Sequence, residues 1–253
     1  MKLTWFDANS WLIESANTRV LVDPWLIGDL VFADSPWLVR GFRPQSIDIP
    51  PNIDLLLLSQ GLADHAHPET LKAIDKSIPV IASPDGAKVA RSLGFQSVQS
   101  IDHGEKLDWE QKIAVEAFVG APVGMTKKEN AYVLSFLTED VRLYYEPHGY
   151  PDAEHLKTVA AVDVAITPMV DQVLMGLAPV IRGSAAAPQI AKLLSPQVML
   201  PTAEAGNASY DGLIAPTLTT KGGVDEMRSR LKKQGATTEL MQPVSGKTLE
   251  LAL

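Results

Sequence analysis

The sequence contains no cysteine among its 253 residues. This absence excludes disulfide bonds, thiolate nucleophiles, and zinc or iron–sulfur sites held by cysteine. Any metal site in this chain must therefore be built from histidine and carboxylate side chains, and the chain has five histidines. The positions of those histidines consequently carry most of the information about metal chemistry.

Long apolar runs and concentrated positive charge are also missing. No apolar stretch reaches the roughly 18 to 20 residues that cross a bilayer, and the amino end MKLTWFDANSWLIES lacks the uninterrupted apolar region of a signal peptide. The net charge is −8, and no basic cluster is present that would neutralise phosphates. We therefore expect a cytoplasmic protein that binds a small molecule and neither membranes nor nucleic acids. The sequence leaves its oligomeric state open.

The chain has enough apolar sequence to build a large core. Hydrophobic residues make up 46% of the composition and charged residues 21%, which is the balance of an ordinary globular protein. We find no linker, low-complexity tract or repeat that would mark a domain boundary. The sequence therefore predicts a single domain that spans residues 1–253.

Short strands separated by turns dominate the first part of the sequence. Residues 2–15 and 18–26 predict two paired strands with Asn17 at the turn, and residues 28–50 predict an excursion over the surface outside the core. A β–α–β–α unit follows, with strands at IDLLLLS and IPVIAS and helices that open at HPETLKAI and PDGAKVARSLG. This alternation predicts that part of the sheet is parallel.

The second half repeats this mixture of antiparallel strands and strand–helix units. Three strands are predicted at KIAVEAFVG, NAYVLSFLT and VRLYYEP. Alternation then returns, with the strand VDVAITPMV, a helix at AAAPQIAKLLS, the strand QVMLPT, a helix at GVDEMRSRLKKQG and the final strand GKTLELAL. Two halves of this kind predict two sheets packed face to face with helices on the outside.

A polar loop follows the apolar strand at residues 55–58. The segment LLLLSQGLADHAHPETL turns from that strand toward a helix and carries Asp64, His65 and His67. Because His67 precedes a proline, which suits the first position of a helix, we expect His67 at the helix start rather than on a metal. Asp64 and His65 are candidate metal ligands. Alternatively, Asp64 only accepts hydrogen bonds from backbone amides of the turn.

Four segments in this order resemble the metallo-β-lactamase superfamily. They are VLVDPW, LLLSQGLADHAHPETL, VRLYYEPHGYPD, and the stretch that runs from ITPMV to IAKLLSPQVMLPT. Within the superfamily they are similar to the L-ascorbate-6-phosphate lactonases. The resemblance covers nearly the whole chain, and it implies an α/β fold arranged as a four-layer αββα sandwich.

The family's central loop has the pattern HxHxDH, and this chain departs from that pattern. Gln60 and Leu62 stand at the first two histidine positions, whereas Asp64 and His65 match the last two. The family's third histidine falls in the segment GAPVGMTKKENAY, which contains none, and its last histidine falls at Ala203. The resemblance therefore implies a degenerate metal site.

Counting ligands leaves one metal position that could still be filled. The resemblance places His148 where the family has a bridging aspartate, so that Asp64, His65 and His148 would supply one carboxylate and two imidazoles. Such a set suits one zinc, iron or manganese ion with open positions. The other metal position would be empty, because Leu62 has no electron pair to donate. We therefore predict one divalent metal ion or none.

Each remaining candidate has a structural alternative. His148 lies between a strand and a glycine, where loops often carry function, but an exposed turn histidine fits the same pattern. Glu146 could act as a general base if no metal is bound, or it could be a paired surface charge. The resemblance implies that Asp23 supports the metal loop through hydrogen bonds. His103 and His155 fit a turn and a solvated helix, and neither is a candidate.

Two functions from different classes follow. The first is a metal-dependent hydrolase of a small ester, lactone or phosphoester, with Asp64, His148 and Glu146 as its catalytic candidates, because one bound ion polarises a carbonyl and lowers the pKa of water. The second is a metal-free, non-catalytic descendant that binds a small molecule or a protein partner in the old cleft. The missing ligands favour the second function, whereas the retained Asp64–His65 pair keeps the first open.

Overall fold

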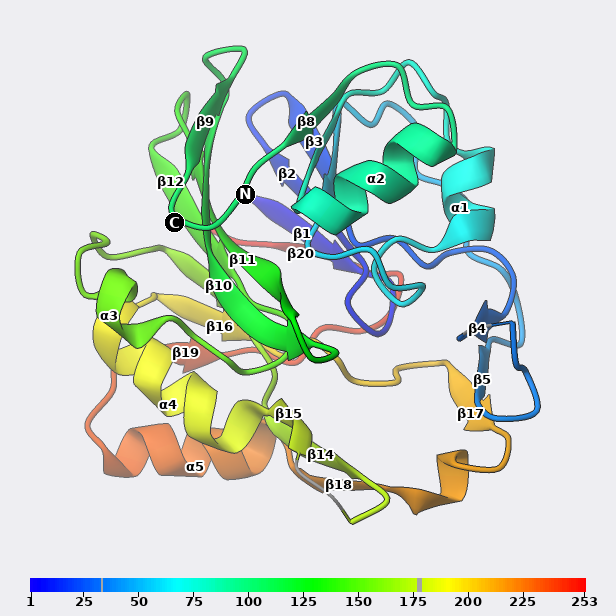
Figure 1. Cartoon of the computed structure of the whole chain (residues 1–253). Helices are drawn as coiled ribbons and strands as arrows, with labels where there is room; N and C mark the ends of the chain where they lie inside the picture. The colour runs from blue at the N-terminus through cyan, green and yellow to red at the C-terminus, as the bar shows by residue number, and fades with distance from the viewer. Residues whose placement is uncertain (33, 177–178) are drawn as a thin grey trace. The chain divides into compact units, whose positions relative to one another are not determined.

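The computed structural model describes residues 1–32, 34–176 and 179–253, and Figure 1 traces the chain from the N-terminus to the C-terminus. Its internal contacts divide the chain into two compact units. The first unit comprises Met1–Ile101, Ala205–Thr217 and Val244–Ala252, and the second comprises Asp102–Glu204, Leu218–Pro243 and Leu253. One domain over residues 1–253 stays a prediction.

The first unit is built on a seven-stranded sheet with the order β20-β1-β2-β3-β6-β7-β8. Neighbours from β20 to β3 are antiparallel, and neighbours from β3 to β8 are parallel, as the β–α–β–α pattern predicted. The bounds of the strands are β1 (Lys2–Trp5), β2 (Trp11–Ser15), β3 (Thr18–Val22), β6 (Leu55–Leu58), β7 (Val80–Ala82), β8 (Val98–Ser100) and β20 (Thr248–Glu250).

One strand prediction in this unit was wrong. Residues 2–15 form two paired strands, β1 and β2, rather than a single strand. The chain reverses between them because Asp7 and Ala8 adopt positive φ angles of 68° and 47°, which extended backbone does not allow. The predicted turn at Asn17 is confirmed, since Ser15 pairs with Thr18 in the antiparallel ladder between β2 and β3.

Two helices follow the parallel strands of this sheet. They are α1 (Pro68–Ala73) after β6 and α2 (Pro84–Ser92) after β7, and each has a proline in its first turn and a side-chain N-cap. Leu71 of α1 and Ala87 and Ala90 of α2 pack in one buried cluster with Leu56 and Leu58 of the sheet. This packing fixes the loop between β6 and α1 at both ends.

The predicted surface excursion at residues 28–50 contains secondary structure. Within it, β4 (Leu30–Val31) pairs with β5 (Arg40–Phe42), and β5 pairs with β17 (Ser209–Asp211). Leu30 is buried, whereas Trp37 is 66% exposed, so the excursion contributes to a small core of its own. Residue 33 lies outside the described residues.

The second unit repeats the plan with the strand order β19-β16-β13-β12-β11-β10-β9. Neighbours from β9 to β12 are antiparallel, and neighbours from β12 to β19 are parallel. The bounds are β9 (Lys106–Trp109), β10 (Ile113–Val123), β11 (Lys127–Phe136), β12 (Val141–Tyr145), β13 (Val164–Ile166), β16 (Val198–Leu200) and β19 (Glu239–Leu240).

The remaining elements of the second unit are three helices and a small sheet. The helices are α3 (Ala153–Leu156), α4 (Gly183–Leu194) and α5 (Val224–Lys233), and Figure 1 shows α4 and α5 side by side. Ile190 and Leu194 of α4 and Leu231 of α5 share one buried cluster with Tyr144 and Met199 of the sheet. The small sheet joins β15 (Pro179–Arg182), β14 (Val170–Leu174) and β18 (Leu218–Gly222), and a short 3-10 helix, η1 (Ala215–Thr217), belongs to the first unit.

Within the described stretches of the chain, no helix is both long enough and apolar enough to cross a membrane. The longest helix in these stretches, α4, has 12 residues.

Candidate metal centre

The loop after β6 is held in place by Asp23, the residue that follows β3. Since β3 and β6 are parallel neighbours, their carboxyl ends lie together, and Asp23 meets Ser59 there. The backbone N–H of Ser59 donates to Asp23 Oδ1 at 2.7 Å, and the Ser59 hydroxyl donates to Asp23 Oδ2 at 2.5 Å. Both residues are fully buried. The hydrogen-bonding role that the resemblance implied for Asp23 is confirmed.

The same carboxylate orients His65, which is also fully buried. His65 Nδ1 lies 2.7 Å from Asp23 Oδ2, and because a carboxylate only accepts, Nδ1 carries the hydrogen. The other ring nitrogen, Nε2, lies 3.3 Å from Asp64 Oδ2 and 3.5 Å from Asn9 Nδ2. The structure therefore brings the predicted Asp64–His65 pair together around Nε2.

The surroundings of His65 favour positive charge. Burial by itself lowers the pKa of the imidazole, but the carboxylates of Asp64 and Asp23 outweigh burial and raise the pKa of His65 well above its usual range. The negative charge of Asp64 also affects the pKa of Tyr210, which belongs to the same unit. Burial and the Asp64 carboxylate raise the pKa of Tyr210 to about 12, so its phenol stays protonated.

The loop contains three further residues that the sequence singled out: His67, Gln60 and Leu62. His67 is the N-cap of α1, as predicted: its Nδ1 accepts from the backbone N–H of Thr70 at 3.3 Å, and its Nε2 donates to the carbonyl of Asp29 at 3.1 Å. Burial lowers the pKa of His67, which suits this neutral capping role. Gln60 is buried, whereas Leu62 is 46% exposed.

In the second unit, Glu146 shapes the loop that follows β12. Its buried carboxylate accepts hydrogen bonds from the backbone N–H groups of His148, Gly149 and Tyr150 at 2.7 to 3.0 Å, and from the hydroxyl of Thr167 at 3.2 Å. Burial and the nearby Glu129 carboxylate raise the pKa of Glu146, although the backbone donors oppose that rise. Glu146 is thus not a surface charge, and its general-base role stays a prediction.

His148 is oriented by a second buried carboxylate. Its Nδ1 lies 2.8 Å from Glu129 Oε2, so Nδ1 carries the hydrogen of this contact. The other oxygen of Glu129 accepts from the backbone N–H of Ala121 at 3.0 Å. The side chain of His148 is 15% exposed, so this histidine is not the exposed turn residue of the alternative prediction.

The two histidines that were not predicted to be site residues have local roles. His103 Nε2 donates to the backbone carbonyl of Glu129 at 3.0 Å, and His155 lies on α3 with 71% of its side chain exposed. Ala203 is buried and has a φ angle of 62°. The predicted set of Asp64, His65 and His148 draws on both units and stays a prediction.

Sequence reasoning missed Glu129, Ser59 and Tyr210. A glutamate and an asparagine precede the apolar run of β11 in the sequence KENAYVLSF, and both are fully buried. A charged residue that opens a buried strand is a usable signal, because burying a carboxylate is costly unless it has partners. Tyr210 lies about 150 residues along the chain from Asp64, and no local pattern connects the two.

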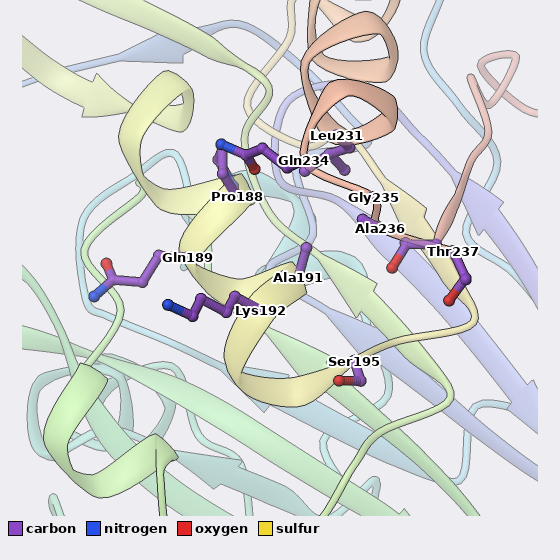
Figure 2. A pocket seen from close by; sticks show the side chains of 11 residues that line it. Pro188, Gln189, Ala191, Lys192, Ser195, Leu231, Gln234, Gly235, Ala236 and Thr237 are labelled. Atoms are coloured by element: carbon purple, nitrogen blue, oxygen red, sulfur yellow. The ribbon is translucent and has the colours of Figure 1, made fainter.

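A cavity of about 730 Å³ lies between α4 and α5 and contains none of these residues (Figure 2). Its polar lining includes Gln189, Lys192, Gln234 and Thr237. In Figure 2, Gln189 and Lys192 extend on one side of α4, whereas Thr237 lies on the opposite wall. The polar groups of this cavity therefore do not converge on one point, as those of a specific small-molecule site usually do.

Comparisons with known proteins agree with this architecture. Residues 2–203 match the family model described as the beta-lactamase superfamily domain. No curated protein matches this sequence. A possible metal-dependent hydrolase from Veillonella parvula is 17% identical, with a TM-score of 0.73 and 99% of each chain covered.

Two further structures are similar to this chain. The isothiocyanate hydrolase from Delia radicum gut bacteria is 14% identical, with a TM-score of 0.70, and the match covers 100% of this chain and 99% of that one. CmlA, a diiron beta-hydroxylase from Streptomyces venezuelae, is 17% identical with a TM-score of 0.68, and the match covers 99% of this chain and 54% of that one. At these identities the likeness shows the fold alone.

The predicted α/β class and the metallo-β-lactamase fold, an αββα sandwich, are confirmed. The closer resemblance to the L-ascorbate-6-phosphate lactonases and the degenerate state of the metal site stay predictions. The protein is hydrolase-like in fold, and its chain belongs to the beta-lactamase superfamily domain family.

Proposed function

We propose that the protein is a metal-dependent hydrolase of a small ester, lactone or phosphoester, with one divalent ion held by Asp64, His65 and His148. One observation carries this proposal. Nδ1 of His65 and Nδ1 of His148 each donate to a buried carboxylate, so Nε2 is the nitrogen with which each histidine would coordinate an ion. Histidines that bind metals almost always have such a partner on the other ring nitrogen.

The donor set fits one ion better than two. Two imidazoles and a carboxylate, with open positions for water and substrate, suit zinc, iron or manganese. The loop has Gln60 and Leu62 at the family's first two histidine positions, and Leu62 offers no ligand atom. The buried carboxylates of Asp23 and Glu129 add negative charge behind the two histidines, which favours a bound cation.

The chain's own residues would divide the work of hydrolysis between them. A bound divalent ion supplies polarisation of the substrate carbonyl or phosphoryl oxygen and lowers the pKa of water. Asp64 has 23% of its side chain exposed, so its carboxylate could accept a proton from water. The buried His65 would only coordinate the ion. The Glu146 carboxylate accepts hydrogen bonds from the backbone of the loop that carries His148, and we assign it no catalytic role.

The experiment is elemental analysis of protein purified without chelator, combined with assays on a panel of lactones, phosphoesters and carboxylic esters. We expect about one ion per chain, and we expect Asp64→Asn to lose most of the metal and the activity, because it removes the anionic ligand. His155→Ala is the matched control, since His155 is exposed on α3. Metal-free wild-type protein without hydrolytic activity would refute the proposal.

The missing family ligands favour a second candidate, a metal-free descendant that binds a small molecule or a protein partner. In that case a proton on the His65 imidazole, rather than a metal ion, would balance the negative charge of Asp64 and Asp23. The same elemental analysis separates the two candidates. A cytoplasmic location, a small-molecule partner, and the lack of membrane and nucleic-acid partners stay predictions.

A further inference from the structure

A second cavity in the second unit, of about 550 Å³, borders the loop that carries His148. Three segments form its walls: the facing ends of β10 and β11, the loop from Gly149 to Asp152 with the start of α3, and the start of α4 with Arg182 before it. The loop begins one residue after His148. The backbone N–H of Arg182 donates to the carbonyl of His148 at 2.9 Å, so the cavity wall is tied directly to that residue.

The acidic and basic side chains that line this cavity differ in the partners they have. Two of the lining residues are acidic, and both are engaged by groups outside the cavity: Asp152 Oδ2 lies 2.6 Å from His155 Nδ1, and Glu154 forms an ion pair with Lys157 at 2.7 Å. The two basic lining residues are Lys128 and Arg182. Within residues 1–32, 34–176 and 179–253, no ion pair engages either of them.

Arg182 is held in a defined position. Its guanidinium lies over the ring of Tyr150, 5.1 Å from the ring centroid. Tyr150 is fixed at both ends, because its hydroxyl donates to the carbonyl of Pro179 at 2.8 Å and its backbone N–H donates to Glu146 at 3.0 Å. A guanidinium stacked on an aromatic face keeps its edge N–H groups available for carboxylate or phosphate oxygens.

Gly149 permits this close approach. Its φ angle is +82°, and a Cβ atom at this position would lie 2.6 Å from the backbone carbon of Arg182. Any larger residue would push the loop after His148 away from the start of α4. The sequence thus keeps Arg182 and Tyr150 next to the candidate ligand.

We propose that this cavity is an oxyanion subsite, in which Arg182 and Lys128 bind a phosphate or carboxylate group of the substrate. As a statement about the substrate, this inference rests on the proposed function, and it names that substrate as a small anionic ester, lactone or phosphoester. The volume lies within the range of small-molecule sites, and Arg182 and Lys128 supply cationic groups of the kind that such sites use to orient an anionic ligand.

The test is calorimetric titration of chelator-treated protein with inorganic phosphate and, separately, with acetate. We expect saturable binding of at least one of the two probes, and the stronger binder shows which oxyanion the subsite takes. Arg182→Gln and Lys128→Gln should each weaken binding about tenfold or more, the loss expected for a charge-assisted hydrogen bond. Lys192→Gln, a lysine on the other cavity, should bind like the wild type.

The outcomes separate the subsite from the metal proposal. Thermal unfolding of each variant confirms that it is folded, and neither substitution removes a buried side chain, because Lys128 and Arg182 are both exposed on their strands. Absence of saturable binding in the wild type, or equal binding by wild type, Arg182→Gln and Lys128→Gln, overturns the inference even if the protein binds metal. Binding that depends on Arg182 supports it even if elemental analysis finds no ion.

Discussion

At the scale of single residues, the two candidate ligand histidines share one arrangement with different partners. His65 donates to Asp23, which follows a strand, and His148 donates to Glu129, which lies within a strand. In both cases the carboxylate is fully buried and has a backbone N–H as a second partner. Each carboxylate thereby fixes the orientation of the ring and engages its Nδ1 atom.

Replacing either carboxylate by its amide should weaken metal binding while preserving shape. We expect Asp23→Asn and Glu129→Gln each to lower metal affinity by about 10- to 100-fold, the usual effect of losing the partner of a metal-binding histidine. Asparagine also tolerates the φ angle of 43° at position 23. Competitive titration against a metal indicator measures the effect, and Asp75→Asn, on an exposed turn, is the control. Unchanged affinity in both variants would remove the support for these ligands.

Glu204 provides a pH-dependent prediction away from the candidate ligands. Burial raises the pKa of this carboxyl, whereas a hydrogen bond from Gln242 opposes the rise. A raised folded-state pKa contributes stability below the ordinary value of 4.5, and that stability is lost as the pH rises through the folded-state pKa. Glu204→Gln should therefore stabilise the protein at neutral pH by about 0.5 kcal/mol and have no effect at pH values below the ordinary pKa. Urea unfolding of the wild type and of Glu204→Gln, at neutral pH and at a pH below 4.5, measures the difference in the free energy of unfolding.

At the scale of elements, the start of α1 anchors the candidate metal loop. Thr70 of α1 is fully buried, and its hydroxyl oxygen accepts from the backbone N–H groups of Leu26 and Ile27 at 2.9 and 3.1 Å. The N-cap His67 contacts the same hydroxyl at 3.1 Å. One side chain thus joins the helix, its cap and the segment after β3, which includes the support residue Asp23.

Thr70→Val keeps the side-chain volume and removes the acceptor. Because two backbone donors would lose their partner, we expect the free energy of unfolding to fall by about 2–3 kcal/mol. Chemical denaturation measures the loss. Thr220→Val, on the exposed strand β18, is the matched control and should change stability by no more than about 0.5 kcal/mol. A loss in the control as large as that in Thr70→Val would contradict this account.

At the scale of the whole molecule, the two units have the same plan. In each, four strands pair antiparallel and the sheet continues with parallel strands that alternate with helices. In each, candidate ligands lie in a loop that follows a central strand, β6 or β12. The proposed ion takes ligands from both units, so its binding should be coupled to the stability of both.

Metal removal tests this coupling together with the single-domain prediction. An ion at a hundredfold excess over its Kd should stabilise the protein by about 2.7 kcal/mol, and a chelator should reverse the effect. Tryptophan fluorescence reports mainly on the first unit, which has four of the five tryptophans, and hydrogen exchange in β11 and β12 reports on the second. We expect coincident transitions that shift together in the wild type and do not respond to metal in Asp64→Asn. Separate transitions would contradict one domain.

Much of the fold was predictable because local patterns determine it. Apolar runs bounded by turns located β6, β7, β10, β11 and β12, and the proline after a capping residue located the starts of α1 and α2. The hairpin within residues 2–15 was not predicted, because positive φ angles at Asp7 and Ala8 leave no strong mark in the sequence. Aspartate adopts such angles more readily than most residues, but it does not require them.

The sequence by itself determined the fold family, the lack of any cysteine-based chemistry, and the positions of the five histidines available to a metal. Only the tertiary structure decided which buried carboxylate orients which histidine, and that Glu146 serves its own loop while Arg182 and Tyr150 border His148. The physical reason is the separation along the sequence between the residues that interact. Strand and helix patterns depend on neighbours within a few residues, whereas Asp23 and His65, or Glu129 and His148, meet only after the strands next to them have paired in a sheet.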